Sequence, residues 1–240
     1  MKGNGCALQF TGGRDSTLTA IRLVEDYRFD SIHLLTFKTD LMSDLNKVFV
    51  NIKRLKGHLK NQANFVYKLL NVQDLLHALY QEKYLRNLLS YGTLQVATFC
   101  FACRLSHHAH SIIYCMNKGI KYAADGVNKL TGFDLFQQPW AVKKVRRLYE
   151  RFNISYITPI FESEVSSEQQ LELISQELNL KNPFVESQPR CLGGGQYHNL
   201  YLRCHYLPMK GKESYIEMSS KWIDDKIKMV IEHIKAHTTA

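Results

Sequence analysis

Residues 6–24 read CALQFTGGRDSTLTAIRLV, and this stretch decides the fold of the chain. Its first five residues form a short apolar run that suits a β-strand. The pair Gly12-Gly13 follows at once, and apolar residues then return at near-helical spacing from Leu18 to Val24. The stretch therefore predicts a strand, a tight loop and a helix.

The same alternation continues along the chain. Apolar residues between 45 and 59 recur every three or four positions, as on one face of a helix. Strands are also predicted at 31–37, 64–69, 120–124 and 155–161, and helices at 72–89, 103–117, 140–151, 166–178 and 215–236. Strands separated by helices imply a parallel sheet. We therefore predict an α/β fold, a doubly wound parallel sheet of about five strands.

A turn-rich stretch after Asn182-Pro183 interrupts this pattern. We place a boundary there, so that residues 1–183 form the main domain. Residues 184–240 then form a small C-terminal extension, with a cysteine-bearing loop and the last helix. The triple glycine at 193–195 follows no strand and precedes no clear helix, so we interpret it as a hinge.

Composition limits the possible functions. The 240 residues are 45% hydrophobic, and this length can bury roughly 70% of the unfolded surface. No stretch approaches the ~18 apolar residues that a membrane span needs, and the N-terminus does not resemble a signal peptide. We expect a soluble cytoplasmic protein with no membrane partner. The formal charge of +9 favours an anionic partner, although a merely basic surface would give the same count.

The glycine pair suits a phosphate site. Between a strand and a helix it lets backbone N–H groups turn towards an anion, and the positive end of the helix adds to the attraction. Ser16 can then donate to a phosphate oxygen, while Asp15 can hold Mg²⁺ or cap the helix. An ordinary strand-to-helix turn would show the same glycines, so the pair alone does not decide.

The complete string Thr11-Gly12-Gly13-Arg14-Asp15-Ser16 decides more, because it resembles the Ser-Gly-Gly-x-Asp-Ser signature of the PP-loop ATP pyrophosphatase superfamily. Thr11 replaces the usual serine and keeps the hydroxyl. The resemblance implies that ATP is split between the α and β phosphates and that a carbonyl or carboxyl oxygen of a second substrate is adenylated. It also implies further nucleotide contacts, which we expect at Phe37, Asp125, Gly126 and Lys129.

Three cysteines are candidates for the second half of the reaction. Cys100 and Cys103 form a Cys-x-x-Cys pair that we place directly before a helix, where the helix end and Arg104 would lower a thiol pKa. The resemblance sharpens this, because sulfur-inserting members such as tRNA 2-thiouridylases and 2-thiocytidine synthetases carry the same pair and a further cysteine. Cys191 is our third member. Cys6 and Cys115 are expected in the core.

Two chemistries fit these thiols. A cysteine persulfide can attack the adenylated carbon while a second cysteine resolves the disulfide. Alternatively, Cys100, Cys103 and Cys191 can ligate a [4Fe-4S] cluster whose free iron binds the sulfur. A zinc site would need more ligands, which Cys204, His205 or His107 could supply. We lean slightly towards the persulfide. His107, His108 and His110 are spread around a helix and favour no metal site of their own.

The acceptor is harder to assign. A nucleobase in tRNA and a small free base or nucleoside both remain open, with a cysteine desulfurase as a suitable sulfur donor. The basic run 143–147 could face phosphates, with Tyr149 and Phe152 nearby for stacking, or could simply be a solvated helix face. An alternative function is a ligase that forms an amide or nitrile on a deazaguanine-like molecule and holds structural zinc. The sequence leaves a homodimer open.

Overall fold

The computed structural model describes residues 4–129, 135–161, 165–182, 184–192 and 200–238. Five parallel strands form the main sheet, in the order β4-β2-β1-β5-β6. They are β1 (Gly5–Gln9), β2 (Ser31–Lys38), β4 (Asn64–Asn71), β5 (Tyr122–Ala124) and β6 (Ser155–Ile157). Two short strands, β3 (Met42–Ser43) and β7 (Arg190–Cys191), pair antiparallel outside it. The prediction of a five-stranded parallel sheet is confirmed.

Helices connect these strands. The α-helices are α1 (Arg14–Glu25), α2 (Val48–Leu59), α3 (Gln73–Leu76), α4 (Tyr84–Tyr91), α5 (Thr98–Lys118), α6 (Pro139–Glu150), α7 (Ser167–Glu177) and α9 (Leu207–His237). Short 3₁₀ turns occupy Leu45–Lys47, Gly92–Ala97 and Leu135–Gln137, and π-helical turns occupy His77–Gln81 and Leu202–Tyr206. Helix α7 begins with the predicted capping box of Ser166 and Gln169.

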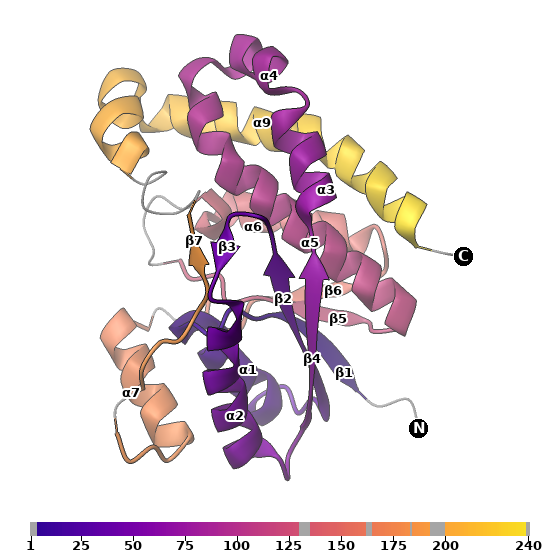
Figure 1. Ribbon diagram of the computed structural model, residues 1–240, viewed down its shortest axis with the longest axis vertical. Coiled ribbons are helices and arrows are strands. Elements are labelled where there is room, and N and C mark those ends of the chain that lie inside the picture. Colours follow the sequence, from indigo (N-terminus) through magenta and orange to yellow (C-terminus); the bar gives the residue numbers. More distant parts are fainter. Residues whose placement is uncertain (1–3, 130–134, 162–164, 183, 193–199, 239–240) are drawn as a thin grey trace.

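The sheet separates two hydrophobic clusters, because side chains alternate between its faces. Along β1, Leu8 packs with α1, α2 and α7, whereas Ala7 packs with α5, α6 and α9. Figure 1 shows the first group of helices in the lower half of the molecule and α5 and α9 in the upper half. Helices on both faces of a parallel sheet confirm the doubly wound architecture.

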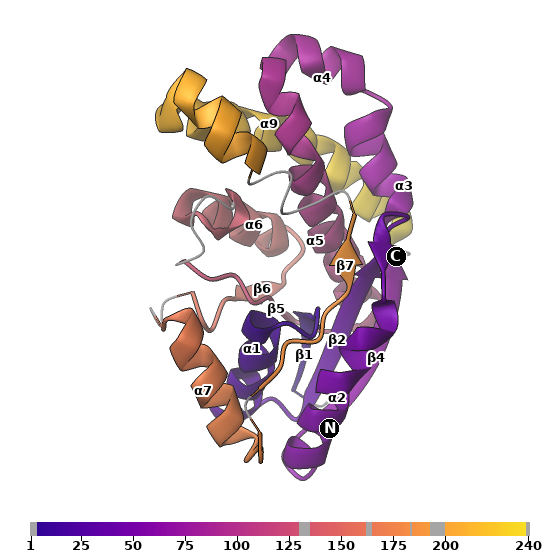
Figure 2. The same ribbon diagram turned by 60° about the vertical axis from the view of Figure 1, so that its left-hand side comes forward.

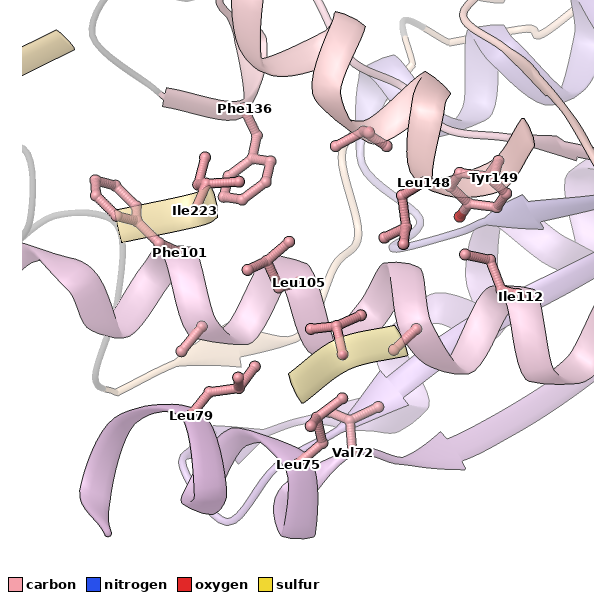
Figure 3. Close-up of a cluster of buried hydrophobic side chains, with 14 of the residues drawn as sticks. Val72, Leu75, Leu79, Phe101, Leu105, Ile112, Phe136, Leu148, Tyr149 and Ile223 are labelled. Carbon is pink, nitrogen blue, oxygen red and sulfur yellow. The ribbon is translucent and has the colours of Figure 1, made fainter. Parts of the chain in front are cut away.

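Helix α5 is the centre of the larger cluster. Figure 3 shows Leu105 on the side of α5 that faces Ile223 of α9, and Leu79 of the π turn His77–Gln81 on the other side of α5. Trp222 and Phe101 add a T-shaped ring contact with centroids 5.8 Å apart. Helix α9 therefore packs back on the body of the chain, as its apolar periodicity predicts, and it begins earlier, with a kink at Gly211.

Several other predicted boundaries were wrong. The helix at 72–89 is broken into α3, a π turn and α4, so that Leu79 is buried while Leu89 is 90% exposed. Polar contacts with α9 turn the chain there, because Lys226 Nζ donates to Asn87 Oδ1 at 2.8 Å. Strand β6 ends at Ile157, two residues before a proline that cannot donate to a strand ladder. Helix α5 begins at Thr98.

No single helix among the described residues is long and apolar enough to cross a membrane. One pair bent by 111°, Tyr84–Gln95 with Thr98–Lys118, meets the criterion when its two parts are counted together. The domain boundary at residue 183 stays a prediction, and the triple glycine at 193–195 lies outside the described residues.

Candidate functional site

The sheet order places a topological switch point at the carboxyl ends of β1 and β5. From β1 the chain crosses to β2 on one side, and later strands add β5 on the other side, so the strand order reverses between β1 and β5. Open α/β sheets bind ligands at such a switch point, outside the carboxyl ends of the strands. The loop Thr11–Ser16 follows β1, and Asp125-Gly126 follows β5. The two loops that we predicted to contact a nucleotide therefore both lie at this switch point.

The loop after β1 has the backbone that the glycines predict. Gly12 has a φ of 75°, in the left-handed region that favours glycine, and Gly13 is extended and forms the N-cap of α1. The Ser16 hydroxyl donates to the Gly13 carbonyl at 3.1 Å and lies 3.3 Å from the Thr11 hydroxyl. Two hydroxyls therefore lie beside the first turn of α1, where the amides of a helix attract anions.

Asn51, a residue that the sequence did not indicate, holds this loop from below. Its side chain on α2 is fully buried and donates to the Gly12 carbonyl at 2.6 Å. Nothing in the local sequence links a helix residue to a loop 39 positions earlier. This amide fixes the direction of the Gly12 peptide.

Asp15 lies in the first turn of α1, facing the second loop. Asn128 Nδ2 donates to its Oδ1 at 3.3 Å, and Arg14 Nε lies 3.5 Å from the same oxygen. Burial raises the pKa of the Asp15 carboxyl, while the Arg14 guanidinium and the Asn128 hydrogen bond oppose the rise. Asn128 is the residue of its loop that reaches Asp15, and Lys129, which we predicted to contact phosphate, is exposed.

Gly126 makes the closest contact between the two loops. A Cβ at this position would lie 2.8 Å from the backbone carbon of Asp15 and 2.8 Å from the nitrogen of Ser16. Asp125, by contrast, turns inwards: its carboxylate is 2% exposed and lies 3.3 Å from Arg104 Nη2 on α5. The two residues therefore have different contacts. Gly126 packs on residues 11–16, which we call the phosphate loop, and Asp125 links the loop after β5 to α5, the helix that carries Cys100 and Cys103.

The Cys-x-x-Cys pair lies inside α5, which corrects our placement of it before the helix. Cys103 Sγ is 3.4 Å from His107 Nε2, one helical turn later. Burial raises the pKa of the Cys103 thiol to about 12, and the Cys191 thiol adds to the rise. The expected lowering of this pKa was wrong, because desolvation outweighs the effect of Arg104.

His107 joins Cys103 to the end of β2. Its ring stacks on Phe37 with centroids 4.3 Å apart and an interplanar angle of 12°. Burial lowers the pKa of His107 well below the usual value for histidine, so the ring is neutral. Phe37, which we expected beside the adenine, is buried and is engaged by this histidine.

The other thiols are distributed as follows. Cys191 lies on β7, exposed, and pairs in register with Met42 of β3. Cys100 is half-buried, near the ring of Tyr80. Cys6 and Cys115 are buried in the core, as predicted, and Cys204 is exposed. Within the part of the chain that the structure describes, no three His, Cys, Asp or Glu side chains are grouped closely enough to hold a metal ion.

His108 and His110 have other partners. His108 is buried, with its Nδ1 2.8 Å from Gln9 Nε2 and its Nε2 4.0 Å from Asp125. His110 Nδ1 lies 2.9 Å from the carbonyl oxygen of Ser106. The three histidines therefore point in different directions, as the sequence predicted.

A segment far along the chain covers the phosphate loop. The Arg14 amide donates to Glu186 Oε1 at 3.2 Å, and the Ser187 amide donates to the Gly12 carbonyl at 3.4 Å. No pattern in the sequence predicts this contact, which joins residues 172 positions apart. Figure 2 shows the orange chain between α7 and β7 passing beside the start of α1.

The basic helix α6 is only partly available for nucleic acid. Lys143, Arg146 and Arg147 are exposed, whereas Lys144 pairs with Asp224 of α9. Tyr149 is fully buried, so the prediction that it stacks on bases was wrong. Phe152 packs partly against the core.

Comparison with known proteins adds little to this geometry. No family model matches the chain, and no curated protein sequence matches it. Among solved structures, the chain is similar to the U34-tRNA thiolase NcsA from Methanococcus maripaludis, determined with its [4Fe-4S] cluster. The likeness covers 95% of this chain and 74% of that one, with 14% identity and a TM-score of 0.46. At these values it assigns no role to any residue.

Proposed function

We propose that this chain is an ATP-dependent sulfurtransferase that adenylates a carbonyl oxygen of a nucleobase and replaces that oxygen with sulfur. One observation carries the proposal: the phosphate loop after β1 and the Cys103–His107 pair beside β2 lie at the carboxyl ends of neighbouring strands. A nucleotide in the loop and a thiol on α5 would therefore lie at the same edge of the sheet.

The nucleotide half is supported by the loop geometry. The hydroxyls of Thr11 and Ser16 lie beside the first turn of α1, where the amides of a helix attract anions. Asp15, held by Asn128, supplies a carboxylate oxygen of the kind that Mg²⁺ prefers. In the proposed first step, the substrate carbonyl oxygen attacks the α phosphorus, the bond to the β phosphate breaks and pyrophosphate leaves.

In the second step, the terminal sulfur of a cysteine persulfide attacks the activated carbon, and AMP leaves with the former carbonyl oxygen. This joins the base to the cysteine through a disulfide. A second cysteine thiolate then attacks the sulfur of the first cysteine and releases the thiolated base. A disulfide between the two cysteines remains, which an external dithiol must reduce before the next cycle.

The thiols divide these roles by exposure. Cys191 is exposed on β7 and can accept sulfur from a donor protein such as a cysteine desulfurase, so we assign it the persulfide. Cys103 is the resolving thiol, because it is partly buried and interacts with the Cys191 thiol. Since burial raises its pKa, Cys103 gives its proton to the neutral His107, whose Nε2 lies 3.4 Å from Sγ, as it attacks. Since no metal-binding group of three side chains forms among the described residues, no step of this scheme uses a cluster or zinc.

The acceptor is a nucleobase, in tRNA or free. The exposed cations of α6, Lys143, Arg146 and Arg147, support the RNA form, because such side chains neutralise phosphates irrespective of sequence. Salt dependence separates the two acceptors: activity on tRNA should fall steeply between low and physiological ionic strength, and activity on a free base should not.

The test begins with ATP labelled at the α phosphate. Labelled AMP and free pyrophosphate should form in the presence of an acceptor. Asp15→Ala and Ser16→Ala should abolish both products, whereas the control Asp26→Ala, at the exposed end of α1, should not. If either loop variant consumes ATP normally, the phosphate-loop assignment is wrong.

Sulfur transfer is tested separately. Cys191→Ser and Cys103→Ser should retain pyrophosphate release and lose transfer of radioactive sulfur, and Cys100→Ser should lose transfer as well only if Cys100 acts with them. Cys204→Ser, also exposed, is the matched control. Anaerobic purification with iron and zinc analysis completes the test, since a stoichiometric iron–sulfur cluster would replace the persulfide scheme.

A further inference from the structure

Residues 184–188, which we call the strap, cover the phosphate loop at three points. Glu186 Oε1 accepts a hydrogen bond from the Arg14 amide at 3.2 Å. Outside the phosphate loop, the Ser187 hydroxyl also donates to the Lys47 carbonyl, before α2, at 2.8 Å. A Cβ at Gly12 would lie 2.4 Å from the Ser187 carbonyl oxygen, and one at Gly13 would lie 2.5 Å from Gln188 Oε1. The strap is therefore in direct contact with both loop glycines.

The Glu186 carboxylate occupies a position that suits a phosphate. The Arg14 amide is in the first turn of α1, where helix amides lack intrahelical partners and attract anions. Glu186 Oε1 also lies 3.9 Å from Arg14 Nε. A phosphate oxygen would use the same amide and the same guanidinium, so the two anions compete for one place.

The first residues of the strap are its anchor on the body of the chain. The ring of Phe184 is buried under the Arg54 guanidinium, Arg54 Nη1 donates to the Val185 carbonyl at 3.1 Å, and the Phe184 amide donates to Ser175 Oγ. Beyond the strap, the chain is held by the two-residue pairing of β7 with β3 and by the Leu192 amide, which donates to Leu41. Displacement of residues 186–188 would therefore be transmitted towards β7.

We propose that the strap is an autoinhibitory contact in which Glu186 takes the place of a nucleotide phosphate, and that nucleotide binding displaces it and repositions Cys191. Cys191 follows Glu186 by five residues. The inference rests on the proposed function, because it requires the loop to bind the polyphosphate of ATP. It explains how sulfur delivery can wait until ATP is bound.

The experiment measures pyrophosphate binding by titration calorimetry, with and without Mg²⁺, in the full chain. Glu186→Gln removes the charge and keeps an acceptor, and Glu186→Ala removes both. Both variants should bind pyrophosphate roughly tenfold more tightly than the unmodified chain, since this is the lower range for one hydrogen bond to a charged group. Glu217→Gln, an exposed carboxylate on α9, is the matched control and should bind like the unmodified chain.

Amide hydrogen exchange gives the second readout. Saturating pyrophosphate should raise exchange at residues 190–192 in the unmodified chain, because the β3–β7 pairing loosens. In the Glu186 variants, exchange there should already be high without ligand. Unchanged affinity in both variants, or unchanged exchange on binding, overturns the strap while the nucleotide site stands.

Two other outcomes are decisive. If the variants bind more weakly and only when Mg²⁺ is present, Glu186 is a ligand of the metal–nucleotide complex and the autoinhibitory contact is wrong. If neither the unmodified chain nor the variants bind pyrophosphate or ATP, the proposed function fails and the strap inference fails with it.

Discussion

Gly126→Ala is the sharpest test of the two-loop site. The added Cβ would lie 2.8 Å from two backbone atoms of residues 15 and 16, which cannot rotate away as a side chain would. Either the loop after β5 or the start of α1 must shift. Overpacking of this kind costs about 1–3 kcal/mol, and a displacement of roughly 1 Å at reacting groups can lower a rate about 100-fold. We expect the free energy of unfolding to fall by about 1–3 kcal/mol and the rate of pyrophosphate release to fall by about 100-fold.

The matched control is Gly57→Ala. Gly57 lies in α2, and a Cβ there would meet nothing within 4 Å. Alanine favours a helix interior over glycine by about 1 kcal/mol, so this variant should be more stable than the unmodified chain. Urea unfolding gives both midpoints, and an unchanged m-value confirms that stability has changed. Equal stability and equal activity of Gly126→Ala and the unmodified chain would refute the close approach of the loops.

Two further variants and one labelling experiment test single residues. Asn51→Ala should lower the free energy of unfolding by about 1–3 kcal/mol in urea titrations, because the buried Gly12 carbonyl loses the Asn51 donor. Asp15→Asn should be more stable than the unmodified chain at pH 7, since burial raises the folded-state pKa of Asp15 and ionisation therefore opposes folding. That advantage should shrink as the pH falls through the raised folded-state pKa and be gone below 3.8, the usual pKa of an aspartate, and a constant difference across this range would contradict it. Cys191 should be alkylated faster than Cys115, which is fully buried, as peptide mass spectrometry would measure; equal rates would show that β7 is covered in solution.

The fold was predictable from sequence because its signals are local. The string from Cys6 to Val24 places a strand, a loop and a helix within 19 residues, and each later strand is bounded by a periodic helix. The start of α5 was not predictable in this way. Residues 98–102 read TFCFA, an apolar run without helical period. They are helical in the structure, where Phe101 and Ala102 pack in the core with side chains of α3 and α9.

The site was predictable where a motif states it and not where the topology creates it. Gly12 and Gly13 have the backbone that the motif implies. Asn51, Asn128 and Glu186 reach the loop across 39, 113 and 172 positions, and no pattern in the sequence joins residues at such separations. The pKa of Cys103 was mispredicted for the same reason, because burial is a tertiary property.

The order of strands brings the phosphate loop and the Cys103–His107 pair to the same edge of the sheet. An adenylated nucleobase is open to hydrolysis, so the attacking sulfur must be close and water must be excluded. The phosphate loop ends β1, the Phe37–His107–Cys103 contacts lie at the end of β2, and Arg104, beside Cys103, binds Asp125 at the end of β5. Helix α5, which carries Cys103, therefore contacts both neighbours of β1 in the sheet, β2 through Phe37 and the end of β5 through Asp125. Cys191 alone comes from outside this frame, on a segment that contacts the phosphate loop before it reaches β3. In the proposed mechanism, a thiol attached in this way can respond to a bound nucleotide, whereas one fixed on α5 cannot.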